Sequence, residues 1–168
     1  MTKAVQDLMV EVERVRDAFV GAVLTADPDA ARALMTTDAT LQIDPTGTGA
    51  SGADPLCRFL TEQIAPGLPA DLAVRRRSRT GDRWHVVDEE TVSFTHDREM
   101  PWLLPGIAAT GCAAEVDVVT VVGVRRSLVV RFRMAWDLLG LADQLGLDPG
   151  QLPRRRHRSL VTDVSRGA

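Results

Sequence analysis

Apolar residues recur at steps of three and four along the first part of the chain, and charged residues fill the positions between them. This period places the apolar side chains on one face of an α-helix. The sequence therefore predicts a long amphipathic helix that packs on a core. Its apolar positions are Val5, Leu8, Met9, Val12, Val15, Phe19, Val20 and Val23.

Two shorter helices are predicted downstream by one start signal, an aspartate followed by a proline. Asp27 is expected to cap the free amides at the start of a helix over residues 30–35, with Pro28 in the first helical position. Asp54 repeats this signal at the start of a helix over residues 54–64. The chain therefore begins with three helices.

Strand-like patterns dominate the second half of the chain. Before them, residues 40–44 alternate as a short strand does, and the glycine-rich residues 45–52 predict a loop. The later β-rich segments are residues 72–79, 84–100, 114–124 and 128–135, with a turn at 80–82, a loop at 101–111 and a closing helix at 138–145. Helices followed by antiparallel hairpins predict an α+β domain.

The composition fits one globular domain over residues 1–150, followed by an arginine-rich tail over residues 151–168. With 168 residues, 45% of them hydrophobic, the chain is long enough to bury a core. The tail has four arginines around His157, so we expect it to be solvated and mobile, and a specific anion site is the alternative. The net charge of -3 gives no reason to expect nucleic acid as a partner, because nucleic-acid-binding domains usually carry a basic face.

Several kinds of chemistry are excluded by residues that the chain lacks. There is no tyrosine and Lys3 is the only lysine, which excludes catalysis by a phenol and argues against Schiff-base chemistry. Cys57 and Cys112 lie outside any Cys-x-x-Cys pattern, so neither a zinc site nor a disulfide framework is expected. No apolar run suits a signal peptide or a membrane span. We expect a soluble cytoplasmic protein without metal or cofactor, in which carboxylates or histidines move protons.

A set of short motifs in the second half resembles a known family. These motifs are Phe94-Thr95-His96 with Arg98-Glu99-Met100, Trp102-Leu103-Leu104-Pro105-Gly106 with Thr110-Gly111, Trp136-Asp137, and Gln144-Leu145-Gly146. With the order of the predicted elements, they resemble the SnoaL-like polyketide cyclase branch of the nuclear transport factor 2-like (NTF2-like) superfamily. The resemblance implies a cone, in which a curved, mostly antiparallel sheet wraps around the N-terminal helices and encloses a pocket for an apolar small molecule. It also implies a homodimer formed through the exposed sheet face.

Asp137 is the first candidate for a catalytic group. The resemblance implies that Asp137 faces the pocket and acts as the general acid/base of a cyclisation. Apolar surroundings would raise the pKa of this carboxyl, and a nearby guanidinium would lower it again, toward the range that favours proton transfer at neutral pH. Asp137 also stands directly before Leu138-Leu139-Gly140-Leu141, where an aspartate can simply cap a helix. The sequence leaves both roles open.

The last predicted strand separates charged from apolar residues by parity. Arg131 and Arg133 share the parity of Asp137, whereas Phe132 and Trp136 take the other face. If Asp137 points inward, both arginines come with it, and Arg131 would stabilise a developing negative charge while Arg133 binds substrate. In the alternative, both arginines are solvated charges outside the strand.

His96 is the second candidate for proton transfer. In one interpretation it faces Asp137 across the pocket and orients or protonates the substrate, and in the other it is a half-buried histidine at a strand end. The remaining candidates for substrate binding are wall or parity neighbours of these groups: Phe94, Arg98, Met100, Trp102 and Trp136. The apolar bulk of the wall residues would exclude water from the reaction.

Departures from the family narrow the choice of reaction. Relatives carry His and Glu where this chain has Arg131 and Phe132, so a reaction that needs that His loses support. Epoxide hydrolases of this fold position water with a tyrosine and an asparagine, which correspond here to Leu41 and Ile43. Ketosteroid isomerases hold an oxyanion with a tyrosine, and this chain has none.

The leading hypothesis is therefore a cofactor-independent cyclase or isomerase of secondary metabolism, such as antibiotic biosynthesis, acting on an apolar polyketide-like molecule. The alternatives are a non-catalytic binding or assembly domain and an epoxide hydrolase or dehydratase of the same fold.

Overall fold

Six strands form one sheet in the computed structural model, which describes residues 2–44 and 46–152. The strands are β1 (Met35–Ile43), β2 (Thr48–Ser51), β3 (Ala73–Gly81), β4 (His85–Thr95), β5 (Ala113–Arg125) and β6 (Leu128–Trp136). Their order across the sheet is β2-β1-β6-β5-β4-β3, and every neighbouring pair is antiparallel except β1 with β6. The predicted mostly antiparallel sheet is confirmed.

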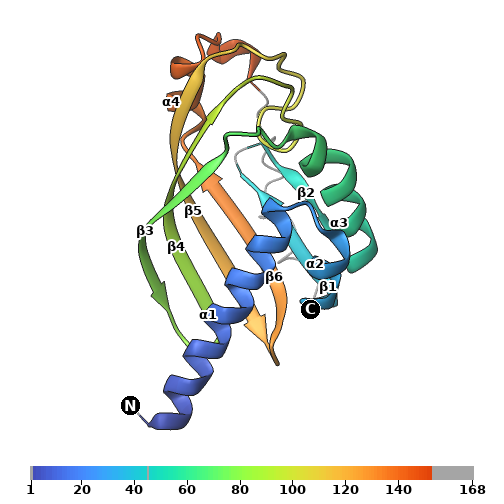
Figure 1. The fold of residues 1–168 in the computed structure, drawn as a ribbon, viewed down its shortest axis with the longest axis vertical. Helices are drawn as coiled ribbons and strands as arrows, with labels where there is room; N and C mark the ends of the chain where they lie inside the picture. The colour runs from blue at the N-terminus through green and yellow to red at the C-terminus, as the bar shows by residue number, and fades with distance from the viewer. Residues whose placement is uncertain (1, 45, 153–168) are drawn as a thin grey trace, which may run out of the picture.

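Helices cover one face of this curved sheet (Figure 1). They are α1 (Lys3–Leu24), α2 (Pro28–Ala33) and α3 (Ala53–Phe59), and a further helix, α4 (Leu138–Gln144), lies at the end of the sheet beside the start of β5. The long helix α1 crosses the face formed by β4, β5 and β6, while α2 and α3 lie beside β1 and β2. Within the described residues no helix is long and apolar enough to cross a membrane. The result is the α+β domain that the patterns predict, in the cone-like form that the family resemblance implies.

The amphipathic pattern of α1 corresponds to its buried face. Val12, Val15 and Phe19 are buried, and the Phe19 ring lies 6.0 Å from the Phe132 ring of β6, measured between centroids. The predicted cap of α2 is also present, because Asp27 accepts a hydrogen bond from the Ala30 amide at 2.9 Å. The contacts of Val12, Val15 and Phe19 place α1 over the centre of the sheet.

The glycine-rich segment contains a strand, so the predicted loop over residues 45–52 is wrong in part. β2 pairs with the end of β1, with Gly49 opposite Gln42. Gly49 has φ +137°, and a Cβ there would lie 2.1 Å from the Leu41 carbonyl oxygen. Glycine therefore permits this strand, because no other residue tolerates both the backbone conformation and the close approach.

The third helix is present but begins and ends differently from the prediction. Gly52 is its N-cap, and Asp54 lies in the first turn, where it forms an ion pair with Arg32 at 2.6 Å instead of capping. After Phe59 the helix widens into a π-helical turn over Leu60–Ile64 and a 3-10 turn over Ala65–Gly67. The arginine-rich tail predicted over residues 151–168 lies, from residue 153 onward, outside the described residues.

Candidate functional site

A small pocket lies between α1 and the sheet. Its walls come from the C-terminal half of α1, the segment that follows α3, and strands β1, β3, β4, β5 and β6. The lining residues are Val20, Val23, Leu24, Leu41, Ile43, Ile64, Leu68, Leu72, Val74, Glu90, Val92, Trp102, Val118, Thr120, Phe132 and Met134. The volume is about 70 Å³, and one buried water requires roughly 10–15 Å³ of such space. The pocket therefore holds a few waters, a short chain or one ring.

The pocket reaches the surface between α1 and β3. Leu24 and Val74 belong to its lining and are 38% and 37% exposed. Leu68 and Leu72, from the segment that leads into β3, complete this rim and are partly buried. These four residues give the pocket an apolar rim.

Glu90 is the only ionisable side chain that lines the pocket in the described part of the chain. It projects from β4, where alternate residues point inward, so the buried Val86 and Asp88 share its face. Thr120 of β5 lies beside it, and its hydroxyl donates to Glu90 Oε2 at 3.4 Å. Together Glu90 and Thr120 form a polar end in an otherwise apolar space.

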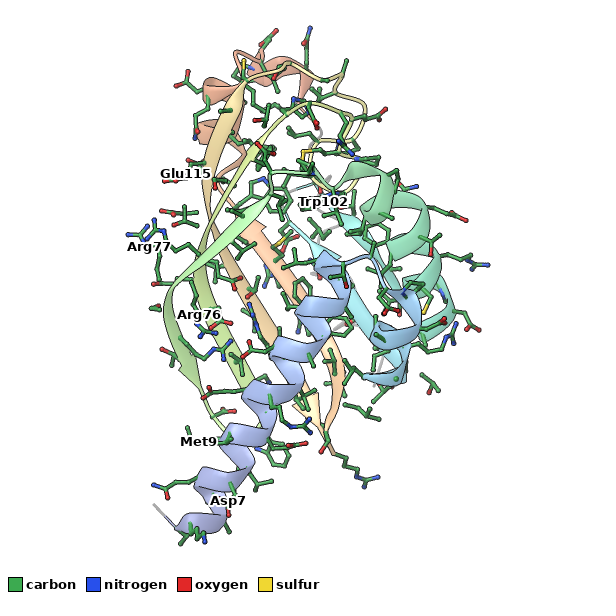
Figure 2. The ribbon with its side chains drawn as sticks, in the orientation of Figure 1. Asp7, Met9, Arg76, Arg77, Trp102 and Glu115 are labelled. Atoms are coloured by element: carbon green, nitrogen blue, oxygen red, sulfur yellow. The ribbon has the colours of Figure 1, made fainter. Side chains whose placement is uncertain are left out.

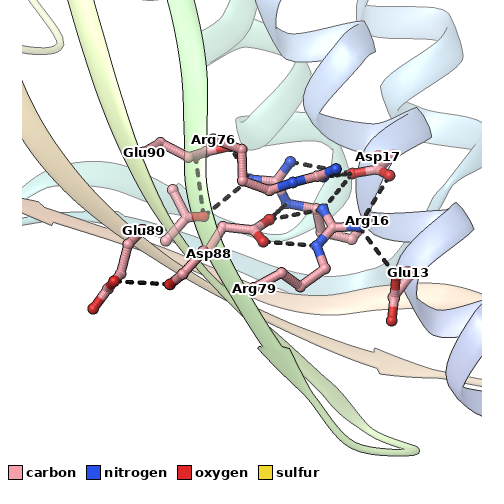
Figure 3. A network of polar contacts seen from close by, with 10 residues as sticks. Glu13, Arg16, Asp17, Arg76, Arg79, Asp88, Glu89 and Glu90 are labelled. Carbon is pink, nitrogen blue, oxygen red and sulfur yellow. Dashed lines mark hydrogen bonds and ion pairs between the residues drawn. The ribbon is translucent and has the colours of Figure 1, made fainter.

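Arg16 of α1 binds this polar end from the helix side (Figure 3). Its Nη2 lies 2.7 Å from Glu90 Oε1 and donates to Thr120 Oγ1 at 3.1 Å. Its Nε lies 2.7 Å from Asp88 Oδ2. The side chains of Arg16, Asp88 and Glu90 are 5%, 0% and 7% exposed. One buried guanidinium therefore joins two buried carboxylates.

Arg79 of β3 continues the network from Asp88 toward the surface. Its Nε and Nη2 donate to the two Asp88 oxygens at 2.7 and 2.8 Å, and Nη2 and Nη1 donate to Asp17 at 2.6 and 3.1 Å. Hydrogen bonds from Arg79 lower the pKa of Asp17, whereas the Asp88 and Asp17 carboxylates raise the pKa of Arg79. Charges of alternating sign therefore run from Asp17 to Glu90.

This network fixes the position of Glu90 more than it adds stability. The attraction within a buried ion pair does little more than offset the cost of removing its charges from water. Removing one partner is nevertheless strongly destabilising, because it leaves the other charge buried and unpaired. Because Arg16 belongs to α1, its contacts hold the helix and the Glu90 carboxylate in one arrangement. The Glu90 carboxylate is thus preorganised at the pocket wall.

Asp137 does not face the pocket, so this part of the prediction is wrong. Its carboxylate is exposed and accepts hydrogen bonds from the amides of Leu139 and Gly140 at 3.1 and 3.0 Å, which makes it the N-cap of α4. The inward parity of β6 belongs to Phe132 and Trp136, because these apolar side chains fill the cone. Of the two roles that the sequence leaves open, the structure shows the cap.

Arg131 and Arg133 lie on the outer face with Asp137, as their shared parity requires. Both are exposed, and Arg133 Nε donates to Asp44 Oδ2 at 2.8 Å. Neither arginine lines the pocket. The expectation that Arg131 stabilises charge and Arg133 binds substrate inside the cone is therefore wrong, and their alternative as charges outside the strand holds.

His96 is fully buried at the end of β4, away from the pocket lining. Its Nδ1 accepts a hydrogen bond from the Thr110 amide at 3.3 Å and lies 3.2 Å from Thr110 Oγ1. Its Nε2 is buried without a hydrogen-bond partner among the described residues. Burial lowers the pKa of His96. The predicted arrangement of His96 and Asp137 across the pocket is wrong, because neither residue lines it.

Among the predicted wall residues, the structure places only Trp102 in the pocket lining. Phe94, Met100 and Trp136 are buried in the core but do not line the pocket. Arg98 pairs with its neighbour Asp97 at 2.8 Å and is partly exposed. The predicted substrate contacts of these four residues are therefore absent from the pocket described above.

The sequence could have indicated Arg16 and Glu90, because both charged residues occupy positions on an otherwise apolar face. Val86, Asp88, Glu90 and Val92 alternate along β4, so two carboxylates occupy positions that otherwise take apolar residues. Arg16 likewise lies on the buried face of α1. Charges on an apolar face indicate either a buried ion pair or a functional site. No group of three or more His, Cys, Asp or Glu residues within the described ranges could hold a metal ion.

The curved sheet, the crossing helix and the internal pocket define the NTF2-like fold, in the form found in SnoaL-like polyketide cyclases and ketosteroid isomerase-like proteins. A protein from Jannaschia sp. CCS1, described as a SnoaL-like polyketide cyclase, superposes with a TM-score of 0.69 and 19% identity, over 84% of this chain and 96% of its own. IdmH from Streptomyces antibioticus, described as a polyketide cyclase, gives 0.62 and 18%, over 80% and 98%.

A third solved structure, an LEH-like epoxide hydrolase from M. tuberculosis, gives a TM-score of 0.60 and 17% identity, over 82% of this chain and 86% of its own. No protein-family model matches the sequence, and no curated protein matches it significantly. At these identities the likeness establishes the fold and leaves the reaction open.

Proposed function

We propose that the protein binds an apolar small molecule in this pocket and catalyses a proton transfer, as a cofactor-independent cyclase or isomerase. The observation that carries the proposal is Glu90, the one ionisable group in the described pocket lining. Carboxylates are suitable groups for moving a proton to or from carbon, and water-poor surroundings strengthen their interactions with developing charge.

The two oxygens of Glu90 differ in their capacity to bind substrate. Oε1 is 2.7 Å from the Arg16 guanidinium, whereas Oε2 receives only the long 3.4 Å hydrogen bond from Thr120. Oε2 therefore retains the capacity to accept a proton or a hydrogen bond from a ligand. The adjacent guanidinium would stabilise the negative charge that the carboxylate regains at the end of a turnover.

The walls suit an apolar substrate with at most one polar group, which would contact Glu90. Leu41 and Ile43 line the pocket at the positions where epoxide hydrolases of this fold carry polar groups, so they provide no means to position a water. Cyclisation or isomerisation needs no positioned water, and it fits these walls better. Because the pocket is small, the reacting end would enter it while the remainder lies at the rim beside Leu24 and Val74.

The direct test follows exchange of carbon-bound protons with solvent deuterium, for a panel of apolar enolisable ketones measured by NMR. Glu90→Gln is expected to lower the exchange rate by about 10²-fold or more, the usual contribution of a general base. Glu89→Gln is the matched control, because Glu89 is the exposed neighbour on the other face of β4. Equal exchange rates in the wild type and Glu90→Gln would contradict the proposal.

A non-catalytic binding domain is the second candidate, and the completeness of the ion pairs favours it. Arg16 and Thr120 already satisfy much of the Glu90 carboxylate. If this candidate is correct, the wild type binds apolar probes but exchanges none of their protons. Binding that survives Glu90→Gln, without exchange in either protein, would therefore identify a binder.

A further inference from the structure

The outer face of the sheet carries a second hollow, opposite the internal pocket. We call it the outer groove, and its lining residues are Trp84, His85, Val121, Gly123, Val124, Arg125, Val130, Arg131 and Arg133. Its volume is about 350 Å³, within the usual range for small-molecule sites of roughly 300–1,000 Å³. The same face carries Arg77 and Glu115, which Figure 2 shows projecting away from α1. The outer groove is thus larger than the internal pocket and separate from it.

Strand pairing explains how the groove forms. Gly123 of β5 pairs with His85 on β4 and with Arg131 on β6, so the three residues form one row across adjacent strands. The outer strands of such a row lie roughly 10 Å apart, because neighbouring strands are separated by about 4.8 Å. Gly123 has no side chain to fill that gap. A Cβ there would lie 3.4 Å from Val130 Cγ2 and 3.6 Å from His85 Cδ2. Gly123 is itself buried, because the side chains of His85, Val130 and Arg131 lie within contact distance of this position.

Positive charge concentrates in this groove although the chain as a whole is acidic. Arg133 is paired with Asp44 at 2.8 Å. Arg125 and Arg131, in contrast, form no ion pair or side-chain hydrogen bond with any residue in the described ranges, and both are exposed. Two guanidiniums are therefore available to an anion.

The groove also offers apolar surface beside these charges. Trp84 is 46% exposed, and Val121 and Val130 are partly buried. We propose that the outer groove binds a small organic anion with a flat apolar body, such as an aromatic carboxylate. Arg131 and Arg125 bind its carboxylate, since guanidinium and carboxylate groups match in planar geometry. The body of the anion contacts the indole and the valines.

A second copy of the chain fits this surface less well. A two-fold axis through the outer groove would bring its guanidiniums against the same guanidiniums of the partner. Two acids on this face already have partners, because Asp117 binds Arg77 at 2.8 Å and Glu89 accepts from Ser78 at 2.8 Å. The charges therefore favour a small anion over self-association at the groove.

Calorimetric titration with phthalate, an aromatic dicarboxylate, tests the proposal on the full chain. Saturable binding of one phthalate per chain is expected, with no binding of its neutral dimethyl ester. Arg131→Gln is expected to weaken phthalate binding about tenfold or more, the effect of one lost charge-assisted contact. Arg98→Gln is the matched control, because it removes one exposed charge that pairs with Asp97 elsewhere.

Three outcomes would overturn the proposal: equal binding of phthalate and its ester, equal loss in Arg131→Gln and Arg98→Gln, or a stable dimer that covers the groove. Sedimentation of the same samples, with and without phthalate, measures the last of these. The result is independent of the internal reaction, because Glu90 lies on the other face of the sheet. Loss of phthalate binding in Arg131→Gln with unchanged proton exchange would separate the two sites.

Discussion

The guanidinium of Arg16 lies 2.7 Å from the Glu90 carboxylate and joins α1 to β4 at the polar end of the pocket. Its Nε also lies 2.7 Å from Asp88. Because all three side chains are almost fully buried, this contact determines both how α1 sits on the sheet and where the pocket carboxylate points.

Arg16→Met tests the structural half of this relationship. The substitution keeps a long side chain but leaves two buried carboxylates without their shared cation, and we expect the free energy of unfolding to fall by about 3–5 kcal/mol. Chemical denaturation measures the change. Arg14→Met is the control on the same helix, because the Arg14 pair with Glu11 is exposed and should contribute little to stability. Equal losses in the two variants would show that Arg16 holds no special position.

Asp137 should matter to stability and not to turnover. Asp137→Ala removes the acceptor for the amides of Leu139 and Gly140 and should cost about 1 kcal/mol of unfolding free energy. Asp137→Asn should cost much less, because asparagine is also a good N-cap. Thermal or chemical denaturation distinguishes the two variants. A large loss of proton exchange in Asp137→Asn, with its stability unchanged, would restore the catalytic role.

His96 should make the protein less stable as the pH falls below neutral. Burial lowers the pKa of His96 in the folded protein, whereas the unfolded chain has the ordinary value of about 6.5. The unfolded state therefore binds more protons between the two values, and the free energy of unfolding rises with pH across that window. Above a pH of about 6.5 the histidine is neutral in both states, so it adds no pH dependence to the free energy of unfolding.

Denaturation at a series of pH values between neutral and moderately acidic measures that slope. His96→Asn should flatten it in this window, whatever the variant costs in absolute stability. His85→Asn is the control, because His85 is exposed on the outer face. An unchanged slope in His96→Asn would show that another group titrates.

Gly49 should tolerate no side chain. Gly49→Ala would place a Cβ 2.1 Å from the Leu41 carbonyl oxygen in a backbone with φ +137°, so β2 must separate from β1. We expect a loss on the order of 2–4 kcal/mol, larger than the cost of a strained backbone alone. Gly106→Ala is the control, because Gly106 has φ +79° with no atom within 4 Å of the added Cβ. Equal losses would show that strain, and not contact, sets the cost.

The sequence determined the order and type of most elements, because their patterns are local. The period of α1, the Asp27 cap and the alternation of the later strands each depend on residues close together in the chain. The motifs from Phe94 to Gly146 added the cone and its closing strand. The sequence did not predict β2, because a strand that contains Gly49 depends on pairing with β1, which only the folded sheet supplies.

Which face of β6 points inward was decided by the tertiary structure alone. Parity showed that Asp137, Arg131 and Arg133 lie on the same face of the strand. The choice of face follows from packing of Phe132 and Trp136 against the core, because burying apolar side chains is favourable and burying unpaired charges is costly. The pairing of Arg16 with Glu90 was also beyond the sequence, because the two are 74 positions apart. Their charges become a site only where α1 crosses β4.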